Sequence, residues 1–137
     1  MSSTDILAFG RDVLARQAFS VMIGAQLDAL EPGRAQLSVP LSPQLLQQDG
    51  FVHGGVLAYL ADNCLTYAGG SVLGKVLTSE FKINYIRPAK DADRLVAVAT
   101  VVGSGKTQAV CRCDVFLDRG GERKVCAAAQ GTIRKAE

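Results

Sequence analysis

The chain has 137 residues, of which 48% are hydrophobic and 20% charged, a globular composition that excludes a wholly disordered protein. The length is typical of one domain, which we expect to span residues 1–137. The formal net charge of +2 is too small to indicate nucleic-acid binding. The basic residues are concentrated in residues 81–137, which could meet an anionic ligand or simply present solvated charges on strands.

The sequence shows no targeting or metal-binding pattern. No basic segment followed by an apolar one opens the chain, and no apolar run approaches the roughly 20 residues of a membrane span. The cysteines form neither a CxxC pair nor a Cys/His spacing that would bind a metal, so we expect free thiols. These are Cys64, Cys111, Cys113 and Cys126. The expected location is the cytoplasm.

The first third of the chain predicts a helix and a hairpin. Residues 4–17 carry an apolar stripe at helical spacing, and Ser3 or Thr4 is suited to cap the helix. Two short runs between Val21 and Pro40 flank the turn signal at residues 31–33, which indicates a pair of strands.

The remainder predicts a loop, one long helix and a series of strands. Residues 41–51 are polar and contain Pro and Gly, as loops do. The apolar residues between Val56 and Ala68 lie on one helical face, and Gly69-Gly70 is expected to end this helix. Four strand-like runs follow, separated by turn signals at residues 87–88, 103–106 and 118–121. The runs are Val76–Tyr85, Arg94–Val102, Thr107–Phe116 and Lys124–Ile133.

This order of helix, two strands, helix and four strands predicts an α+β class with a mostly antiparallel sheet. Strands follow one another instead of alternating with helices, which argues against a parallel sheet. One long helix on one face of the sheet leaves limited core for so many apolar strand residues. We therefore expect a partner, most simply a second copy related by twofold symmetry.

The start of the long helix is the first candidate site. His53-Gly54-Gly55 precedes the helix, where backbone N–H groups have no partners within the helix and the helix dipole favours negative charge. Small residues allow a ligand to approach the backbone. The alternative is an ordinary junction between loop and helix.

Asp62 lies on the same helix, away from its apolar stripe. It is the one acidic residue between Asp49 and Glu80, and a carboxylate among apolar residues is suited to act as base or nucleophile. Its alternative role is a surface residue. Asp62 lies seven residues beyond Gly55, about 10 Å along a helix, which an Asp side chain cannot span. If both groups act on one carbonyl, the carboxylate must come from another chain, and the site is shared between protomers.

Three segments in order resemble the hotdog-fold acyl-CoA thioesterases, in particular the phenylacetate-pathway (PaaI-like) and thioesterase-superfamily-member-2-like branches. They are Val52–Asn63 with its HGG and following Asp, Asn84–Ala89, and Gly105–Thr107. The resemblance covers roughly residues 19–134. It implies a hotdog fold, in which an antiparallel sheet wraps around a long central helix.

The resemblance also implies roles for individual residues. The N–H of Gly55 would polarise a thioester carbonyl, and Asp62 of the partner chain would be nucleophile or general base. Gln47, six residues before the histidine, would orient the thioester or the water, and Thr78 would position the attacking water. His53, the sole histidine, would orient the helix start and not act as acid or base.

The same resemblance places coenzyme A near two turns, where Arg87, Lys90 and Lys106 could meet its phosphates. Lys106 does not belong to a Walker A loop, since that pattern requires Gly where Thr100 stands. The residues expected to line the substrate site or neighbour coenzyme A are Gly54, Tyr59, Asn63, Tyr67, Phe81, Arg87, Pro88, Lys90, Gly105 and Lys106.

The leading interpretation is therefore hydrolysis of an acyl-CoA without metal or bound cofactor, by a homodimer or a dimer of dimers, with no nucleic acid or membrane as partner. Two alternatives stay open. One is a hotdog hydratase or dehydratase acting on an acyl-CoA or acyl carrier protein, which would need a His and an acid poised at the acyl chain. The other is a dimer that binds acyl-CoA without turnover. The acyl group, aromatic or medium-chain, does not follow from the sequence.

Overall fold

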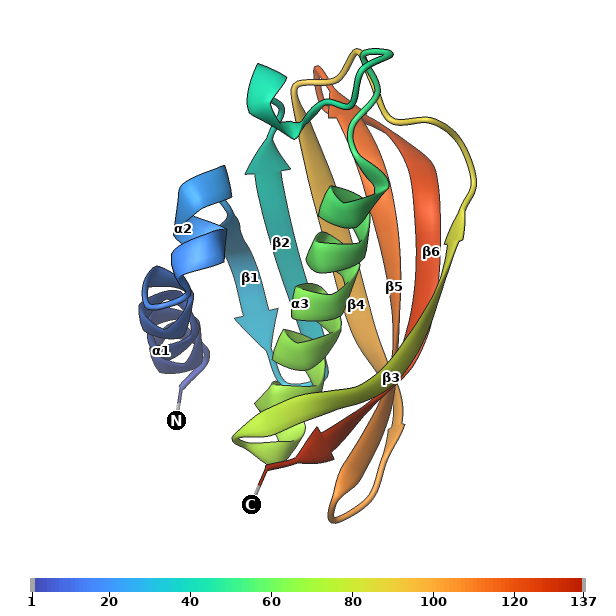
Figure 1. Cartoon of the computed structure of the whole chain (residues 1–137). Helices are drawn as coiled ribbons and strands as arrows, with labels where there is room; N and C mark the ends of the chain where they lie inside the picture. Colours follow the sequence, from blue (N-terminus) through green and yellow to red (C-terminus); the bar gives the residue numbers. More distant parts are fainter. Residues whose placement is uncertain (1, 137) are drawn as a thin grey trace.

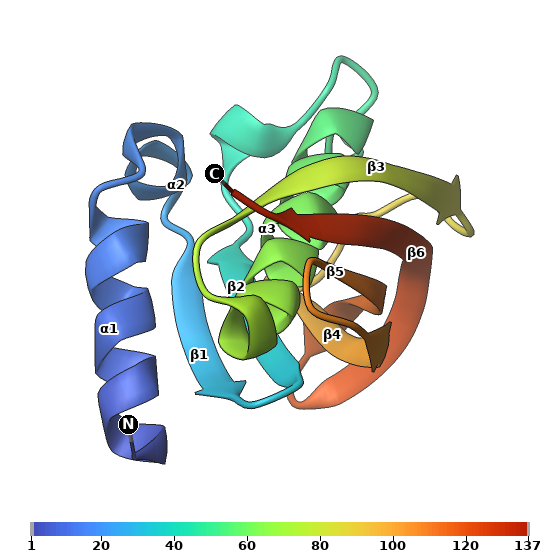
Figure 2. The ribbon, with the colours of Figure 1, turned by 90° about the horizontal axis from the view of Figure 1, so that it is seen from below.

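The computed structural model, which describes residues 2–136, contains one six-stranded antiparallel sheet with the strand order β1-β2-β4-β5-β6-β3. The sheet curls around the long helix α3, which lies against its concave face (Figures 1 and 2). This is the α+β class and the hotdog fold that were expected. The elements in chain order are α1 (Ser3–Ala15), α2 (Ala18–Ile23), β1 (Gln26–Glu31), β2 (Arg34–Pro40), a 3-10 turn (Pro43–Leu45), α3 (Gly54–Leu73), β3 (Val76–Tyr85), β4 (Arg94–Ser104), β5 (Gln108–Arg119) and β6 (Glu122–Lys135).

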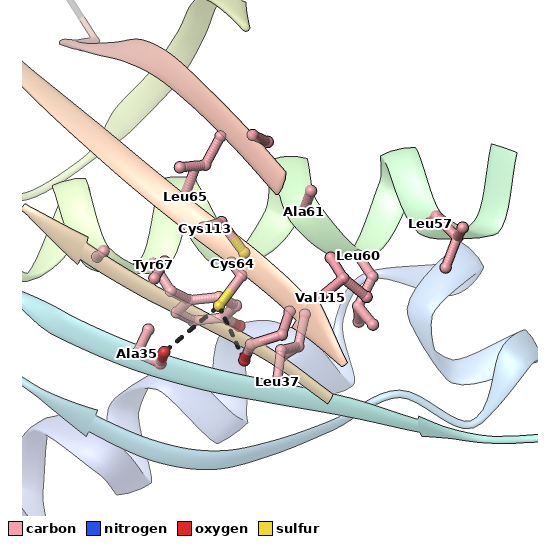
Figure 3. Packing of buried hydrophobic residues seen from close by; sticks show 14 of the residues in the cluster. Ala35, Leu37, Leu57, Leu60, Ala61, Cys64, Leu65, Tyr67, Cys113 and Val115 are labelled. Atoms are coloured by element: carbon pink, nitrogen blue, oxygen red, sulfur yellow. Dashed lines mark hydrogen bonds between the residues drawn. The ribbon is translucent and has the colours of Figure 1, made fainter. Parts of the chain in front are cut away.

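The core lies between α3 and the sheet. Leu60, Cys64 and Leu65 of α3 are fully buried against strand residues such as Leu37 and Val115 (Figure 3). The Cys64 thiol also donates to the carbonyl oxygen of a β2 residue, so this polar group is satisfied inside the core. The apolar stripe read from the sequence is thus the face that α3 presents to the sheet.

The prediction that Gly69-Gly70 end the long helix was wrong. The helix α3 begins at Gly54, passes through both glycines and ends before Gly74, whose φ is +92°. A Cβ on Gly69 would lie 2.7 Å from Cγ2 of Ile133, so this glycine allows α3 to approach β6 closely. Packing against the sheet therefore carries the helix past residues that locally favour its end.

The predicted start of the first strand at Val21 was also wrong. Residues 18–23 form the short helix α2, which ends at Gly24 with φ +79°. Phe19 of α2 packs edge-on against Tyr59 of α3, with 5.0 Å between ring centroids. This contact joins residues far apart in the sequence, so no local pattern reveals it.

The first helix is shorter than predicted and has a different cap. It spans Ser3–Ala15, and its N-cap is Ser2, whose hydroxyl accepts the N–H of Asp5. The four later strands are confirmed: β3 has the predicted bounds, β4 and β6 are longer than predicted, and β5 begins one residue later and ends three residues later.

The turn predicted at residues 87–88 does not join neighbouring strands. β3 pairs with β6, from Val76 opposite Lys135 to Tyr85 opposite Ala127, so residues 86–93 cross the end of the sheet to reach the central strand β4. The other two turns do join neighbours, β4 to β5 and β5 to β6. Long-range pairing therefore places β3 at one edge of the sheet.

The two edges of the sheet differ. At the β1 edge, α1 covers the strand, and Nε of Arg11 donates to the carbonyl oxygen of Leu27 at 3.0 Å. β3 forms the other edge and exposes Leu77 and Tyr85. Between residues 2 and 136, no helix combines the length and the hydropathy that a membrane crossing needs.

Candidate active site

The start of α3 has the geometry of an anion-binding turn. His53 is the N-cap, and its Nδ1 accepts the N–H of Gly55 at 3.3 Å, while its carbonyl oxygen accepts the N–H of Val56 at 2.9 Å. Gly55 is exposed. Because 3.3 Å is long for such a bond, a ligand oxygen can replace the imidazole nitrogen as acceptor. His53 therefore caps the start of α3 by accepting the N–H groups of Gly55 and Val56.

Tyr85 is a neighbour of this turn that the sequence reasoning missed as a site residue. Its hydroxyl donates to the carbonyl oxygen of Gly54 at 3.1 Å, and a Cβ on Gly54 would lie 3.5 Å from the Tyr85 ring. This is an ordinary van der Waals distance, so the Tyr85 ring lies directly against the start of α3. Tyr85 lies in the segment Asn84–Ala89 that carries the family resemblance, which was the available signal.

The structure brings Asp62 and Thr78 together. Oγ1 of Thr78 donates to Oδ1 of Asp62 at 2.7 Å, and both residues are half-buried. A bulge between Thr78 and Glu80 sets the register of β3, so that Thr78 lies opposite Ile133 and Phe81 opposite Gly131. Thr78 thereby shares the face of β3 that packs toward α3.

Gln47 is held at the same end of the molecule as His53. Its N–H donates to the carbonyl oxygen of Phe51 at 2.8 Å, and its side-chain oxygen accepts the N–H of Asp49. The N–H of His53 donates to the carbonyl oxygen of Leu45 at 2.8 Å. The loop that carries Gln47 is therefore fixed beside the start of α3.

A cavity of about 330 Å³ opens beside Asp62, between α3 and the link from α1 to α2. Tyr59 and Asn63, which were expected to line the substrate site, are among the residues that line this cavity. Its other lining residues are Gln17, Ala18, Phe19, Ser20 and Thr66. The residues from 17 to 20 were missed because the sequence reasoning placed no second helix there.

Two other predicted lining residues lie elsewhere. Tyr67 is buried in the core, and its hydroxyl donates to the carbonyl oxygen of Gly10 at 2.8 Å. Burial, with a smaller contribution from Tyr59, raises the pKa of Tyr67 to about 12. Phe81 is partly buried and packs against the core. Neither residue is among those that line the cavity beside Asp62.

The residues proposed for coenzyme A divide between the two ends of α3. Arg87, Pro88 and Lys90 lie near its start, because the N–H of Val52 donates to the carbonyl oxygen of Ala89 at 2.8 Å. Nζ of Lys90 lies 5.2 Å from the centre of the Phe51 ring.

Gly105 and Lys106 lie at the opposite end, in the turn between β4 and β5 (Figure 1). The N–H of Lys135 donates to the carbonyl oxygen of Thr107 at 2.7 Å. The N–H of Ala136 donates to the carbonyl oxygen of Lys75, just beyond the end of α3, at 2.9 Å. A helix of 20 residues is about 30 Å long, so the two groups of residues do not meet within one chain.

Gly55 and Asp62 both belong to α3, so the separation of about 10 Å expected from the sequence applies in the folded chain. Among residues 2–136, no group of three or more His, Cys, Asp or Glu side chains is arranged to hold a metal ion. The chemical groups of the site are thus a backbone N–H at one place and a carboxylate with a hydroxyl at another.

Comparison with known proteins gives a consistent family. Residues 49–124 match the family model of the thioesterase superfamily. The crystal structure of a thioesterase family protein from Silicibacter pomeroyi is 34% identical, with a TM-score of 0.87, and the match covers 97% of each chain. The acyl-coenzyme A thioesterase PaaI of Escherichia coli is 31% identical over 88 residues, 64% of this chain and 63% of its own. The fold of the E. coli PaaI protein, from the phenylacetic acid degradation operon, superposes with a TM-score of 0.87 at 24% identity, covering 98% of this chain and 96% of that one.

Proposed function

This chain belongs to the thioesterase superfamily and is a thioester hydrolase, and we propose that it hydrolyses an acyl-CoA to a carboxylic acid and coenzyme A at a site shared by two protomers. The name of the E. coli relative supports an acyl-CoA substrate. The basic residues near the start of α3, Arg87 and Lys90, suit the phosphates of coenzyme A.

The observation that carries the proposal is the hydrogen bond from Thr78 to Asp62 beside the cavity. Thr78 orients the carboxylate and, through its hydroxyl oxygen, a water. As general base, Asp62 takes a proton from that water while the water oxygen adds to the thioester carbonyl carbon. The C–S bond then breaks, and the sulfur of coenzyme A leaves as a thiolate that takes up a proton.

Asp62 can also act as nucleophile in the same geometry. Its carboxylate oxygen then adds to the carbonyl carbon, the C–S bond breaks, and water cleaves the resulting anhydride to give the acid and restore the carboxylate. Both routes place negative charge on the carbonyl oxygen. The N–H of Gly55 stabilises that charge when the oxygen replaces Nδ1 of His53 as its acceptor.

The distance between the two groups on α3 supports the proposal of a shared site. If two copies pair through the open β3 edge with their α3 helices antiparallel, Gly55 of one copy faces the partner's Asp62. Within one chain, Lys106 lies at the opposite end of α3 from Arg87 and Lys90. The same arrangement brings the partner's Lys106 toward these two residues. Gln47, in the loop that leads to the start of α3, is proposed to orient the thioester.

The first test is the variant Asp62→Asn, assayed by thiol release from a panel of acyl-CoAs. Loss of the base or nucleophile is expected to lower kcat about 10²–10⁴-fold with an unchanged fold. Asp114→Asn is the matched control, because Asp114 is also half-buried but lies on β5, outside this cavity. An unchanged kcat in Asp62→Asn would remove Asp62 from the mechanism.

The shared geometry is tested by mixing two inactive variants. Gly55→Pro removes the N–H at a position in the first helical turn where proline is tolerated, and Asp62→Asn removes the acid. A heterodimer of the two contains one intact site and is expected to recover activity. Verified heterodimers without recovery would show that each chain carries a complete site.

A further inference from the structure

Four polar side chains beside Asp62 form a closed ring of hydrogen bonds between α3 and the link from α1 to α2. Oε1 of Gln17 accepts from the hydroxyl of Ser20 at 2.6 Å and from Nδ2 of Asn63 at 2.9 Å. The hydroxyl of Tyr59 accepts from Nδ2 of Asn63 at 3.1 Å and bonds to Oγ of Ser20. All four residues line the cavity that contains Asp62.

One donor of these four side chains takes no part in the ring of hydrogen bonds. The single hydroxyl proton of Ser20 goes to Gln17, so Tyr59 must donate its own proton to Ser20. Asn63 uses both of its N–H groups, on Gln17 and Tyr59. Two donors converge on one oxygen of Gln17, which fixes the orientation of that amide and leaves Nε2 as the remaining donor.

Nε2 of Gln17 is open to a ligand. It takes part in no hydrogen bond among the residues that the structure describes. Within the same residues, no buried side-chain nitrogen or oxygen lacks a partner, so this nitrogen is reached by solvent. Gln17 is one of the residues that line the cavity, and Nε2 is the donor of its side chain that the ring leaves free.

The size and the other walls of the cavity indicate what reaches this donor. About 330 Å³ is at the lower end of small-molecule sites, so the cavity suits the acyl part of a substrate and not the whole of an acyl-CoA. Ala18 and the rings of Phe19 and Tyr59 supply apolar surface. The carboxylate of Asp62 in the same cavity disfavours a second negative charge there.

We propose that Gln17 determines acyl specificity by donating from Nε2 to a neutral oxygen at the far end of the acyl group. The inference rests on the proposed acyl-CoA hydrolysis and names the substrate class. A plain alkyl chain that reaches the ring of hydrogen bonds removes water from Nε2 of Gln17 without replacing the hydrogen bond to that water. This loss disfavours the binding of such a chain. An acyl group ending in a hydroxyl or keto oxygen restores the bond.

The test compares straight-chain acyl-CoAs of increasing length with their counterparts that carry a keto oxygen next to the terminal methyl group, because a keto oxygen accepts a hydrogen bond and cannot donate one. The measured quantity is the ratio of kcat/KM for the keto over the plain member of each pair. In the wild-type protein this ratio is expected to exceed one at the length that reaches Gln17. In Gln17→Glu it is expected to fall about fivefold, the loss of one neutral hydrogen bond.

Gln17→Glu suits this test because it keeps the shape of the side chain and an oxygen in the ring, while an oxygen replaces the Nε2 donor. Any effect of the added charge on Asp62 changes both members of a pair and cancels in the ratio. Gln17→Met removes the donor without a charge and is expected to lower the ratio equally. Gln130→Glu, on an exposed position of β6, is the control whose ratio stays at the wild-type value.

The outcomes separate this inference from the proposed function. Thiol release with a ratio that is the same in the wild type, Gln17→Glu and Gln17→Met overturns the inference and leaves acyl-CoA hydrolysis standing. Absence of thiol release from every acyl-CoA by the wild type overturns both. If melting curves show that Gln17→Glu does not fold, the ratio in Gln17→Met decides.

Discussion

Asp62 and Thr78 come from different elements, and their hydrogen bond of 2.7 Å is the most specific contact of the site. A hydroxyl that donates to a carboxylate fixes the plane of the carboxylate and keeps one of its oxygens free for a water or a carbonyl carbon. In the proposed mechanism Thr78 is thus a positioning residue as well as a neighbour of the attacking water.

We expect Thr78→Val to lower kcat by about 10–100-fold, because a hydrogen bond to a charged group contributes roughly 1.5–3 kcal/mol. Thr78→Ser keeps the hydroxyl and is expected to retain most of the wild-type kcat. Steady-state kinetics on one good acyl-CoA measures both variants. Equal losses in the two variants would contradict the role given to the hydroxyl, because Thr78→Ser retains it.

Burial raises the pKa of cysteine thiols in this protein. All four cysteines are buried and free. Burial raises the pKa of Cys111 and of Cys126 to about 11, above the unfolded value of about 8.5. Because the folded pKa is raised, these thiols contribute stability that is complete below about pH 8.5 and is lost as the pH rises toward 11.

The expected outcome is that the folded protein does not react with a colorimetric thiol reagent at about pH 8, whereas all four thiols react in denaturant. Denaturant titrations should show the free energy of unfolding decreasing above about pH 8.5. Rapid labelling of the folded chain would contradict the burial of these residues. The low background also suits a thiol-release assay of activity.

At the scale of elements, the contact between α3 and β6 depends on one glycine. A Cβ on Gly69 would lie 2.7 Å from Cγ2 and 2.8 Å from Cβ of Ile133, whereas a Cβ on the neighbouring Gly70 would lie 3.4 Å from Val76. The two adjacent glycines therefore have different reasons to be in the helix. Gly69 is required by packing, and Gly70 has room for a methyl group.

We expect Gly69→Ala to destabilise the protein by about 1–3 kcal/mol through overpacking. Gly70→Ala changes the adjacent residue, which has more space around it. This variant is expected to be neutral or to stabilise by up to about 1 kcal/mol through helix propensity. Denaturant unfolding of the two variants measures the difference. Similar stabilities would show that α3 can shift away from Ile133 without loss.

At the scale of the whole molecule, the sheet has one covered edge and one open edge. α1 covers β1, and β3 is left at the other side with exposed Leu77 and Tyr85. One open edge per chain permits a closed pair of copies, whereas two open edges would permit continued growth. The open edge is thus consistent with the twofold dimer that the proposed shared site requires.

Sedimentation is expected to give twice the chain mass of 14.5 kDa or a multiple of that pair. If each site needs two chains, specific activity falls on dilution at the same concentration at which the dimer dissociates. Full activity of an isolated monomer would contradict the shared site.

The sequence by itself determined the class of the fold, the long helix and the four later strands. Apolar periodicity at 3.6 and 2 residues is a local property, and it matches the faces that α3 and the strands bury. The HGG segment and Asp62 could be located in the same way, because a helix start and a position on a helix are read from neighbouring residues. Their separation of about 10 Å needed only the geometry of a helix.

Only the tertiary structure decided the rest. The continuation of α3 through Gly69, the formation of α2 and the pairing of β3 with β6 depend on contacts between distant segments, which outweigh local preference. The meeting of Thr78 with Asp62 depends on the packing of β3 against α3, and a bulge after Thr78 keeps Phe81 on the same face of β3. The ring around Gln17 likewise exists because α2 packs on α3, since hydrogen bonds between distant side chains leave no periodic signal in a sequence.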